Sequence, residues 1–92
     1  MAFANGEQSP VTSDLAPSVR EFILKRFPLA RKNQVKNSDH LLESGMLDSQ
    51  GVLEVVAFIE QEFSISVSDD DLVPQNFQTI DRIAAFVQSK TG

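Results

Sequence analysis

Residues 45–63, GMLDSQGVLEVVAFIEQEF, place Asp48 and Ser49 directly before an apolar stretch with helical spacing. Aspartate and serine both cap helices by accepting a hydrogen bond from a backbone N–H of the first turn. The stretch therefore predicts a helix that starts at Asp48 or Ser49 and ends at about Phe63 or Ser64. Its apolar residues form one stripe that we expect to be buried, namely Val52, Val55, Val56, Ile59 and Phe63.

A neighbouring stripe of the same helix has mixed character. It holds Gln50, Leu53, Glu54, Ala57 and Gln61. A stripe with apolar and acidic members suits contact with a partner protein, but Leu53 fits a thickened core equally well. Helical periodicity leaves both interpretations open.

The sequence after this helix predicts a break, a short helix and a last long helix. The acidic run at 69–71 lacks the spacing and the glycine of a calcium loop, so we expect an exposed turn there. A short helix is expected at about Pro74 to Phe77. Thr79 is a suitable cap for the last helix, in which Ile80, Ile83, Ala84 and Val87 recur at helical spacing.

The sequence before residue 45 predicts one more long helix and a long connection. A first helix starts at about Ser13, with Pro17 in its first turn, and ends before Pro28. Its apolar face consists of Leu15, Val19, Phe22, Ile23 and Phe27. Residues 28–48 must then pack through their own side chains or serve a function. Their expected anchors are Leu41, Leu42, Met46 and Leu47.

These elements predict an all-α fold: a small antiparallel four-helix bundle of three long helices and one short one, with the long loop between helices one and two. Residues 1–13 are expected to form a disordered tail and residues 14–90 one domain. The expected core consists of Phe22, Phe27, Val56, Ile59, Phe63, Ile80, Ile83 and Val87.

The charge of the chain is uneven. Its 92 residues have a net charge of −5, and residues 48–92 hold eight of the 13 acidic residues. An acidic surface disfavours nucleic acid and favours basic protein partners. The basic residues gather at one place, which we interpret as a solvated face: Lys25, Arg26, Arg31, Lys32 and Lys36. No stretch is long and apolar enough to span a membrane, so we expect no membrane association and a cytoplasmic protein.

The chain offers little for catalysis or metal binding. It has no cysteine and a single histidine, His40, which we expect to be an exposed loop residue rather than a metal ligand. A hydrolase that uses Ser49 with His40 would need the two side chains within hydrogen-bond reach. No nucleophile-elbow motif surrounds Ser49, and we predict that the protein is not an enzyme.

The stretch LLESGMLDSQGVLEVVAFIEQEF, residues 41–63, resembles acyl and peptidyl carrier proteins, and ISVSDDDLVPQNFQTIDRIAAFV after it is similar to their third and fourth helices. In that family, the serine after the aspartate receives a 4'-phosphopantetheine arm from coenzyme A. The resemblance implies that Ser49 is the attachment site and that Asp48 helps the phosphopantetheinyl transferase to engage. Gln50 departs from the family pattern, in which this position is usually leucine or another apolar residue.

The resemblance also implies partners. The arm would hold an acyl or aminoacyl group as a thioester, loaded by an acyl- or aminoacyl-adenylating ligase and passed to a downstream acyltransferase or synthase. The family's partner-facing side corresponds here to Gln50, Leu53, Glu54, Ala57, Glu60 and Gln61. Basic patches on the partners would complement its acids.

The cargo and the context are open to alternatives. Details of the sequence look more like free-standing carriers than like the housekeeping fatty-acid carrier. Seven phenylalanines leave little room for a long chain, which favours a short cargo, and a sizeable cavity between helices two and four would count against it. An unmodified helical adaptor and a carrier excised from an assembly line are the alternatives. The start at Met1 and the ending SKTG favour a free-standing chain, which we expect to be a monomer.

Overall fold

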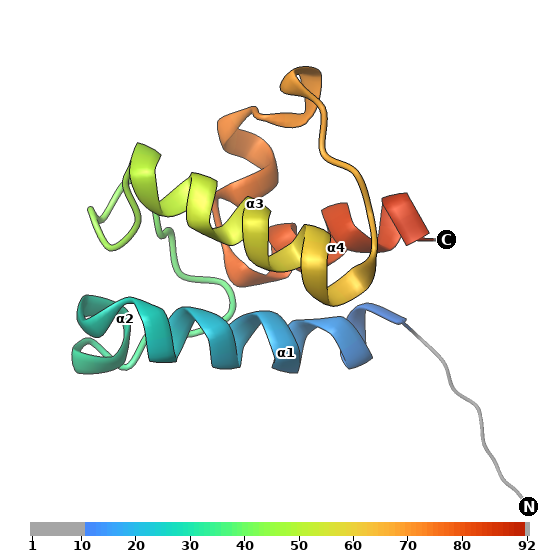
Figure 1. Cartoon of the computed structure of the whole chain (residues 1–92). Helices are drawn as coiled ribbons and strands as arrows, with labels where there is room; N and C mark the ends of the chain where they lie inside the picture. The colour runs from blue at the N-terminus through green and yellow to red at the C-terminus, as the bar shows by residue number, and fades with distance from the viewer. Residues whose placement is uncertain (1–10, 92) are drawn as a thin grey trace, which may run out of the picture.

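The structure, a computed structural model, describes residues 11–91, with side chains from residue 15 onward. Three long helices dominate: α1 (Val11–Arg26), α3 (Ser49–Phe63) and α4 (Ile80–Thr91). Three short elements join them: α2 (Pro28–Lys32), η2 (Asp69–Asp71) and η3 (Pro74–Phe77). Figure 1 shows α1 and α3 running in opposite directions, with α4 packed behind them. The described residues contain no strand, and the predicted all-helical bundle is confirmed.

The core lies mainly between α1 and α4, which share the most extensive contact of any two elements. Its fully buried side chains come from all parts of the described chain and include Val19, Ile23, Val35, Leu41, Val55, Ile59, Phe77, Ile80, Ile83 and Val87. Four predicted core residues, Phe22, Phe27, Val56 and Phe63, are only partly buried and pack against the edge of this cluster. Two of the phenylalanines, Phe22 and Phe58, stack with ring centroids 4.2 Å apart between α1 and α3.

The first helix begins earlier than the sequence predicts. It starts at Val11 rather than at about Ser13, so Pro17 lies inside α1 and not in its first turn. A proline in a helix interior removes one backbone hydrogen bond, a cost that burial of the apolar face can offset. Residues 1–10 of the expected tail lie outside the described residues.

The long connection contains a helix that the sequence analysis missed. Pro28 both ends α1 and opens α2, because a proline at the first position of a helix lacks only an N–H that would be unpaired there anyway. The rest of the connection is tied to the bundle. The Arg20 guanidinium donates to the Val35 carbonyl (2.7 Å), and the Leu41 N–H donates to the Gln78 carbonyl (2.7 Å).

The four expected anchors of the connection point inward. Leu41 and Leu47 are buried, and Leu42 and Met46 pack against the core, as predicted. Gly45 between them has a positive φ of 81°, a conformation that costs a glycine little. The connection is therefore an ordered part of the domain that delivers the chain to the start of α3.

The predicted elements after α3 are also found. The Thr79 hydroxyl accepts from the Arg82 N–H (3.0 Å) and caps α4, and the short helix Pro74–Phe77 is confirmed as η3. The acidic run is not merely a turn, since it forms η2 with a capping box between Ser68 and Asp71. No helix among the described residues is long and apolar enough to cross a membrane.

Candidate functional site

Ser49 is the first residue of α3, and its side chain is exposed. The residue before it, Asp48, is extended, and its carboxylate accepts a hydrogen bond from the Gly51 N–H at 2.8 Å. This bond satisfies one of the N–H groups that the first turn of a helix leaves unpaired. The predicted cap is confirmed, and it fixes the start of the helix so that the Ser49 hydroxyl stands at the helix N-terminus.

The first turn of α3 lies directly on the connection and on the end of α1. A Cβ atom added at Gly51 would be 2.7 Å from Leu47 Cδ1 and 3.1 Å from Phe27 Cε1, too close for either contact to stay unchanged. A residue without a Cβ atom fits this close approach, which explains why glycine, a weak helix former, occupies this buried position of α3. The close approach holds the first turn of α3, which begins with Ser49, against Leu47 and Phe27.

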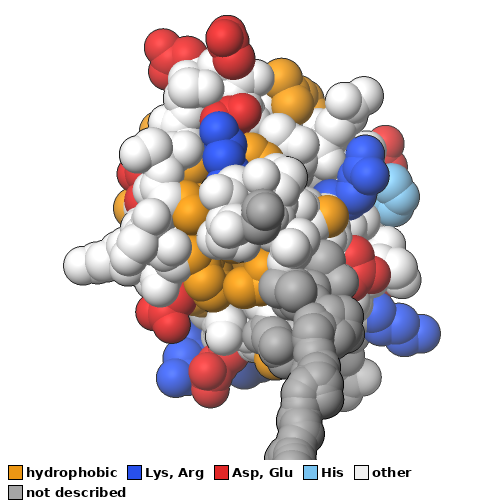
Figure 2. All heavy atoms as spheres, turned by 90° about the vertical axis from the view of Figure 1, so that its right-hand side faces the viewer, with side chains coloured by type: hydrophobic (Ala, Val, Ile, Leu, Met, Phe, Trp, Pro, Cys, Tyr) orange, Lys and Arg blue, Asp and Glu red, His pale blue; other side chains and the backbone are white. Residues whose placement is uncertain are grey.

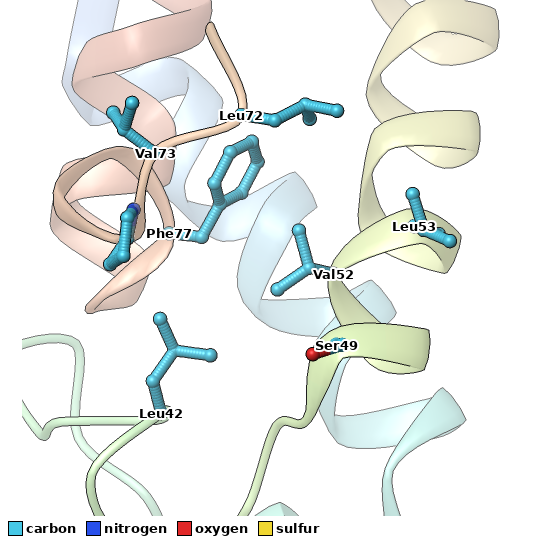
Figure 3. Close-up of a pocket in the computed structure, with 8 residues that line it drawn as sticks. Leu42, Ser49, Val52, Leu53, Leu72, Val73 and Phe77 are labelled. Carbon is cyan, nitrogen blue, oxygen red and sulfur yellow. The ribbon is translucent and has the colours of Figure 1, made fainter. Parts of the chain in front are cut away.

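An apolar groove of about 320 Å³ opens beside Ser49. It lies between the first turns of α3, the connection and the segment from η2 to η3 (Figure 3). Ser49 is the one polar residue among its lining residues, which are Leu42, Ser49, Val52, Leu53, Leu72, Val73, Pro74 and Phe77. In Figure 3, Val52 and Phe77 point toward each other, and Leu72 reaches across toward α3.

The far wall of the groove is held in place by Asp71. Its carboxylate pairs with the Lys90 ammonium at 2.7 Å and accepts from the N–H and hydroxyl of Ser68, both at 3.0 Å. The ion pair with Lys90 and the bond from the Ser68 N–H lower the pKa of Asp71 below its usual value of 3.8. Leu72 and Val73 follow directly, so this cluster links the groove wall to the last turn of α4.

The two acids on the predicted partner-facing stripe already have partners within the chain. Glu54 forms an ion pair with Arg26, the last residue of α1, and Glu60 accepts from the Val67 N–H at 2.9 Å. The other members, Gln50, Leu53, Ala57 and Gln61, are exposed and uncharged. Leu53 is 53% exposed, which excludes the interpretation that it thickens the core.

Exposed acidic charge also gathers at another part of the molecule. Figure 2 shows acidic side chains gathered at the top, where Figure 1 places η2. Asp69 and Asp70 of this element are exposed. They flank the far wall of the groove, so the acids nearest the groove on that side come from η2 and not from α3.

His40 lies apart from the groove's lining residues, in the connection. Its side chain is exposed, as predicted, and its Nδ1 lies 3.4 Å from the carboxylate of Glu43. No hydrogen bond between described side chains joins His40 to Ser49. His40 is therefore not placed to act as a base for Ser49.

Sequence reasoning missed Arg26 and the far wall of the groove. Arg26 and Glu54 are 28 positions apart, and Leu72 and Phe77 are more than 20 positions from Ser49. The only sequence signal for the pairing was the position of Arg26 within the basic cluster, which we interpreted as a solvated face. The groove could not be predicted from a local pattern, because its lining residues come together only in the folded chain.

Comparison with known proteins identifies the family. Residues 18–87 match the sequence profile of the family described as the phosphopantetheine attachment site. The chain is 29% identical over 66 residues to the "Probable acyl carrier protein PigG" of Serratia sp. (strain ATCC 39006), covering 72% of this chain and 76% of that protein. It is 27% identical over 74 residues to the "Acyl carrier protein homolog" of Mycoplasmopsis pulmonis (strain UAB CTIP), covering 80% of this chain and 97% of that protein. The chain therefore belongs to the family of phosphopantetheine-binding carrier proteins, which bear covalent 4'-phosphopantetheine and are carriers, not catalysts.

Proposed function

We propose that Ser49 is the residue to which 4'-phosphopantetheine is attached, and that the protein carries an acyl or aminoacyl group on this arm between partner enzymes. The observation that carries the proposal is the position of Ser49: an exposed hydroxyl at the start of α3, at the edge of an apolar groove. The hydroxyl is within reach of a modifying enzyme, and the groove offers an apolar surface beside it.

The surroundings of Ser49 fit a phosphodiester. The N-terminus of a helix carries a partial positive charge, and the 15 residues of α3 are enough to develop it. Asp48 holds the helix start at this residue through its bond to Gly51. An anionic group on Ser49 Oγ would thus be placed where the helix dipole favours it.

The attachment is a transfer to the serine oxygen. Ser49 Oγ forms a bond to the phosphorus of the phosphopantetheine half of coenzyme A, and the bond from that phosphorus to the bridging pyrophosphate oxygen breaks. The nucleotide leaves with that oxygen, and the serine proton passes to a base of the transferase. When bound, the arm supplies a terminal thiol for thioesters, and the chain has no cysteine that could compete with it.

The shape of the groove supports a short cargo. Its volume is at the small end of the roughly 300–1,000 Å³ found for ligand pockets, and it is open at the surface. None of its lining residues comes from α4, so it is not a cavity between α3 and α4. We propose a short acyl or aminoacyl cargo that an adenylating ligase loads and that an acyltransferase or synthase receives.

Intact mass spectrometry tests the attachment. The purified chain is incubated with coenzyme A, magnesium and a broad-specificity phosphopantetheinyl transferase, beside Ser49→Ala and, as a matched control, Ser66→Ala, which alters another exposed serine. We expect the parent and Ser66→Ala to gain the mass of one phosphopantetheine and Ser49→Ala to gain nothing.

Two results would count against the proposal. A gain in Ser49→Ala would place the arm on another hydroxyl. No gain in the parent with two unrelated transferases would favour an unmodified adaptor, and Gln50→Leu would then test whether this departure from the family pattern is the cause.

A further inference from the structure

We propose that Arg26, by pairing with Glu54, keeps the stripe of α3 around Leu53 free of net charge, so that the transferase that acts at Ser49 contacts this stripe through an apolar surface. The inference rests on the proposed attachment at Ser49 and concerns the kind of partner that fits around it. It opposes the simpler expectation, drawn from the acidic sequence, that basic patches on the partners recognise α3.

Three exposed apolar side chains form a rim around the groove: Leu53 on α3, and Leu72 and Val73 on the far wall. Leu53 is 53% exposed, and the other two are each 38% exposed. Leu53 follows Ser49 by four residues, about one helical turn or ~6 Å along the axis. An enzyme that reaches the Ser49 hydroxyl therefore covers Leu53 as well.

Glu54, which follows Leu53 in the sequence, is paired within the chain itself. Glu54 pairs with Arg26, so the carboxylate and the guanidinium together contribute no net charge beside the rim. The cancellation holds at a distance because opposite charges this close produce only a short-range dipolar field. Glu60 lies 11 residues beyond Ser49, ~16 Å along the helix, which exceeds the screening length of about 8 Å at physiological salt.

The exposed residues of α3 indicate which kind of surface on the partner would fit them. The exposed residues of the α3 stripe are Gln50, Leu53, Ala57 and Gln61, none of them charged. A basic group on the partner would gain little from the paired Glu54, whereas an apolar depression would gain by covering Leu53. We therefore expect an apolar contact surface on the partner opposite α3, with no basic residue aimed at Glu54.

The transferase is the partner that every carrier of this family needs, so it is the probe. We would measure kcat/KM for the carrier at saturating coenzyme A, using the full chain and one broad-specificity transferase. Leu53→Gln should lower kcat/KM about tenfold or more. Leu29→Gln is the matched control, because Leu29 is 52% exposed but lies on α2 outside the rim, and it should stay within about twofold of the parent.

Removal of Arg26 gives the sharper test. Arg26→Gln leaves Glu54 as a lone carboxylate that an apolar partner surface must desolvate, so kcat/KM should fall several-fold. Lys25→Gln removes the same charge from the neighbouring position, where the lysine pairs with the exposed Glu21 at 3.8 Å, and should have little effect. The double variant Arg26→Gln/Glu54→Gln should recover most of the loss. Thermal unfolding of each variant checks that it is folded.

The outcomes separate this inference from the proposed function. If Arg26→Gln raises kcat/KM at low salt and loses the gain at high salt, the partner reads Glu54 with a basic group and the inference is wrong. Equal rates for Leu53→Gln and Leu29→Gln also overturn it, with attachment at Ser49 intact. Absence of modification in every chain, the parent included, overturns both.

Discussion

Asp48 has two separable duties, one shown by its contacts and one proposed. Its side chain caps α3 by accepting from the Gly51 N–H. Its charge is also expected to be read by the transferase that modifies Ser49. Asparagine is about as good a cap as aspartate but carries no charge, whereas alanine provides neither property. Substitutions at this one position can therefore distinguish the two duties.

We expect Asp48→Asn to keep the stability of the parent and to slow phosphopantetheine transfer about tenfold. Asp48→Ala should slow transfer and also lose about 1 kcal/mol of stability, because the cap is gone. In a domain of this size that loss lowers the melting temperature by roughly 4–8 °C. Thermal unfolding by circular dichroism and intact mass against time measure the two effects.

The contrary result is equally clear. Transfer to Asp48→Asn at the parent's rate would show that the carboxylate serves only as a cap.

The cap was predictable from sequence because it acts over three residues. The role of Gly51 was not, since it depends on its close approach to Leu47 and to Phe27, which lies 24 positions earlier, and these contacts form only in the folded chain.

The segment from Ser68 to Val73 is the element whose stability depends most visibly on charge. Asp71 joins Ser68 in a capping box and pairs with Lys90 from α4. These contacts lower the pKa of the Asp71 carboxyl, so the folded state favours its charged form. A lowered pKa in the folded state adds stability above the unfolded-state pKa and loses it as the pH falls through the folded-state value.

The predicted consequence concerns the stability gap between the parent and Asp71→Asn. This gap should be constant above about pH 5 and should close as the pH falls below about 3.8, the value for an unperturbed aspartate. Melting temperatures of both chains, taken at steps of about half a pH unit from about pH 3 to about pH 7, measure this gap.

Asp70→Asn is the matched control, because Asp70 is the exposed neighbour in η2 and makes none of the described side-chain contacts of Asp71. We expect it to unfold like the parent throughout. A gap for Asp71→Asn that does not change with pH would mean that the charge of this carboxylate adds nothing to the fold.

The elements that the sequence predicted well are those with local start signals. Asp48, Pro74 and Thr79 mark the starts of α3, η3 and α4, and each start falls within one residue of its expected place. The start of α1 has no comparable signal and was misplaced. α2 was missed because five residues are too few for a periodic pattern and because Pro28 reads equally as a stop.

The connection between α1 and α3 is packed into the core, so we expect it to unfold together with the helices. Its residue Leu41 is fully buried, and the N–H of the same residue donates to the Gln78 carbonyl just before α4. The segment between two helices thus contributes to the core shared by all of them. By contrast, substitutions in a flexible loop would leave the packing of the core unchanged.

We therefore expect Leu41→Ala to lower the free energy of unfolding by about 2–5 kcal/mol, the usual cost of emptying a buried leucine site. Leu29→Ala, at an exposed leucine in the same connection, should cost less than about 0.5 kcal/mol. Urea unfolding followed by circular dichroism measures both. Equal stability of the two variants would show that the connection is not part of the cooperative fold.

The candidate site was predictable only in part, for a physical reason. The pattern of Asp48, Ser49 and the helix after them is local, and it points to the serine without any tertiary structure. The groove and the pairing of Arg26 with Glu54 join distant parts of the chain, and no local pattern encodes them. The acidic sequence of the second half favoured basic partners for α3, and it could not indicate that Glu54 is paired with Arg26, because that ion pair forms only on folding.

The pairing of Lys90 with Asp71 bears on how this carrier could be used as a portable acylation tag. The family match ends at residue 87, which would be a natural place to trim the chain before fusing it to another protein. A tag cut there would keep every residue that lines the groove but lose the ammonium that anchors the groove's far wall. The boundary of such a tag belongs after Lys90, with the spacer attached beyond the last turn of α4.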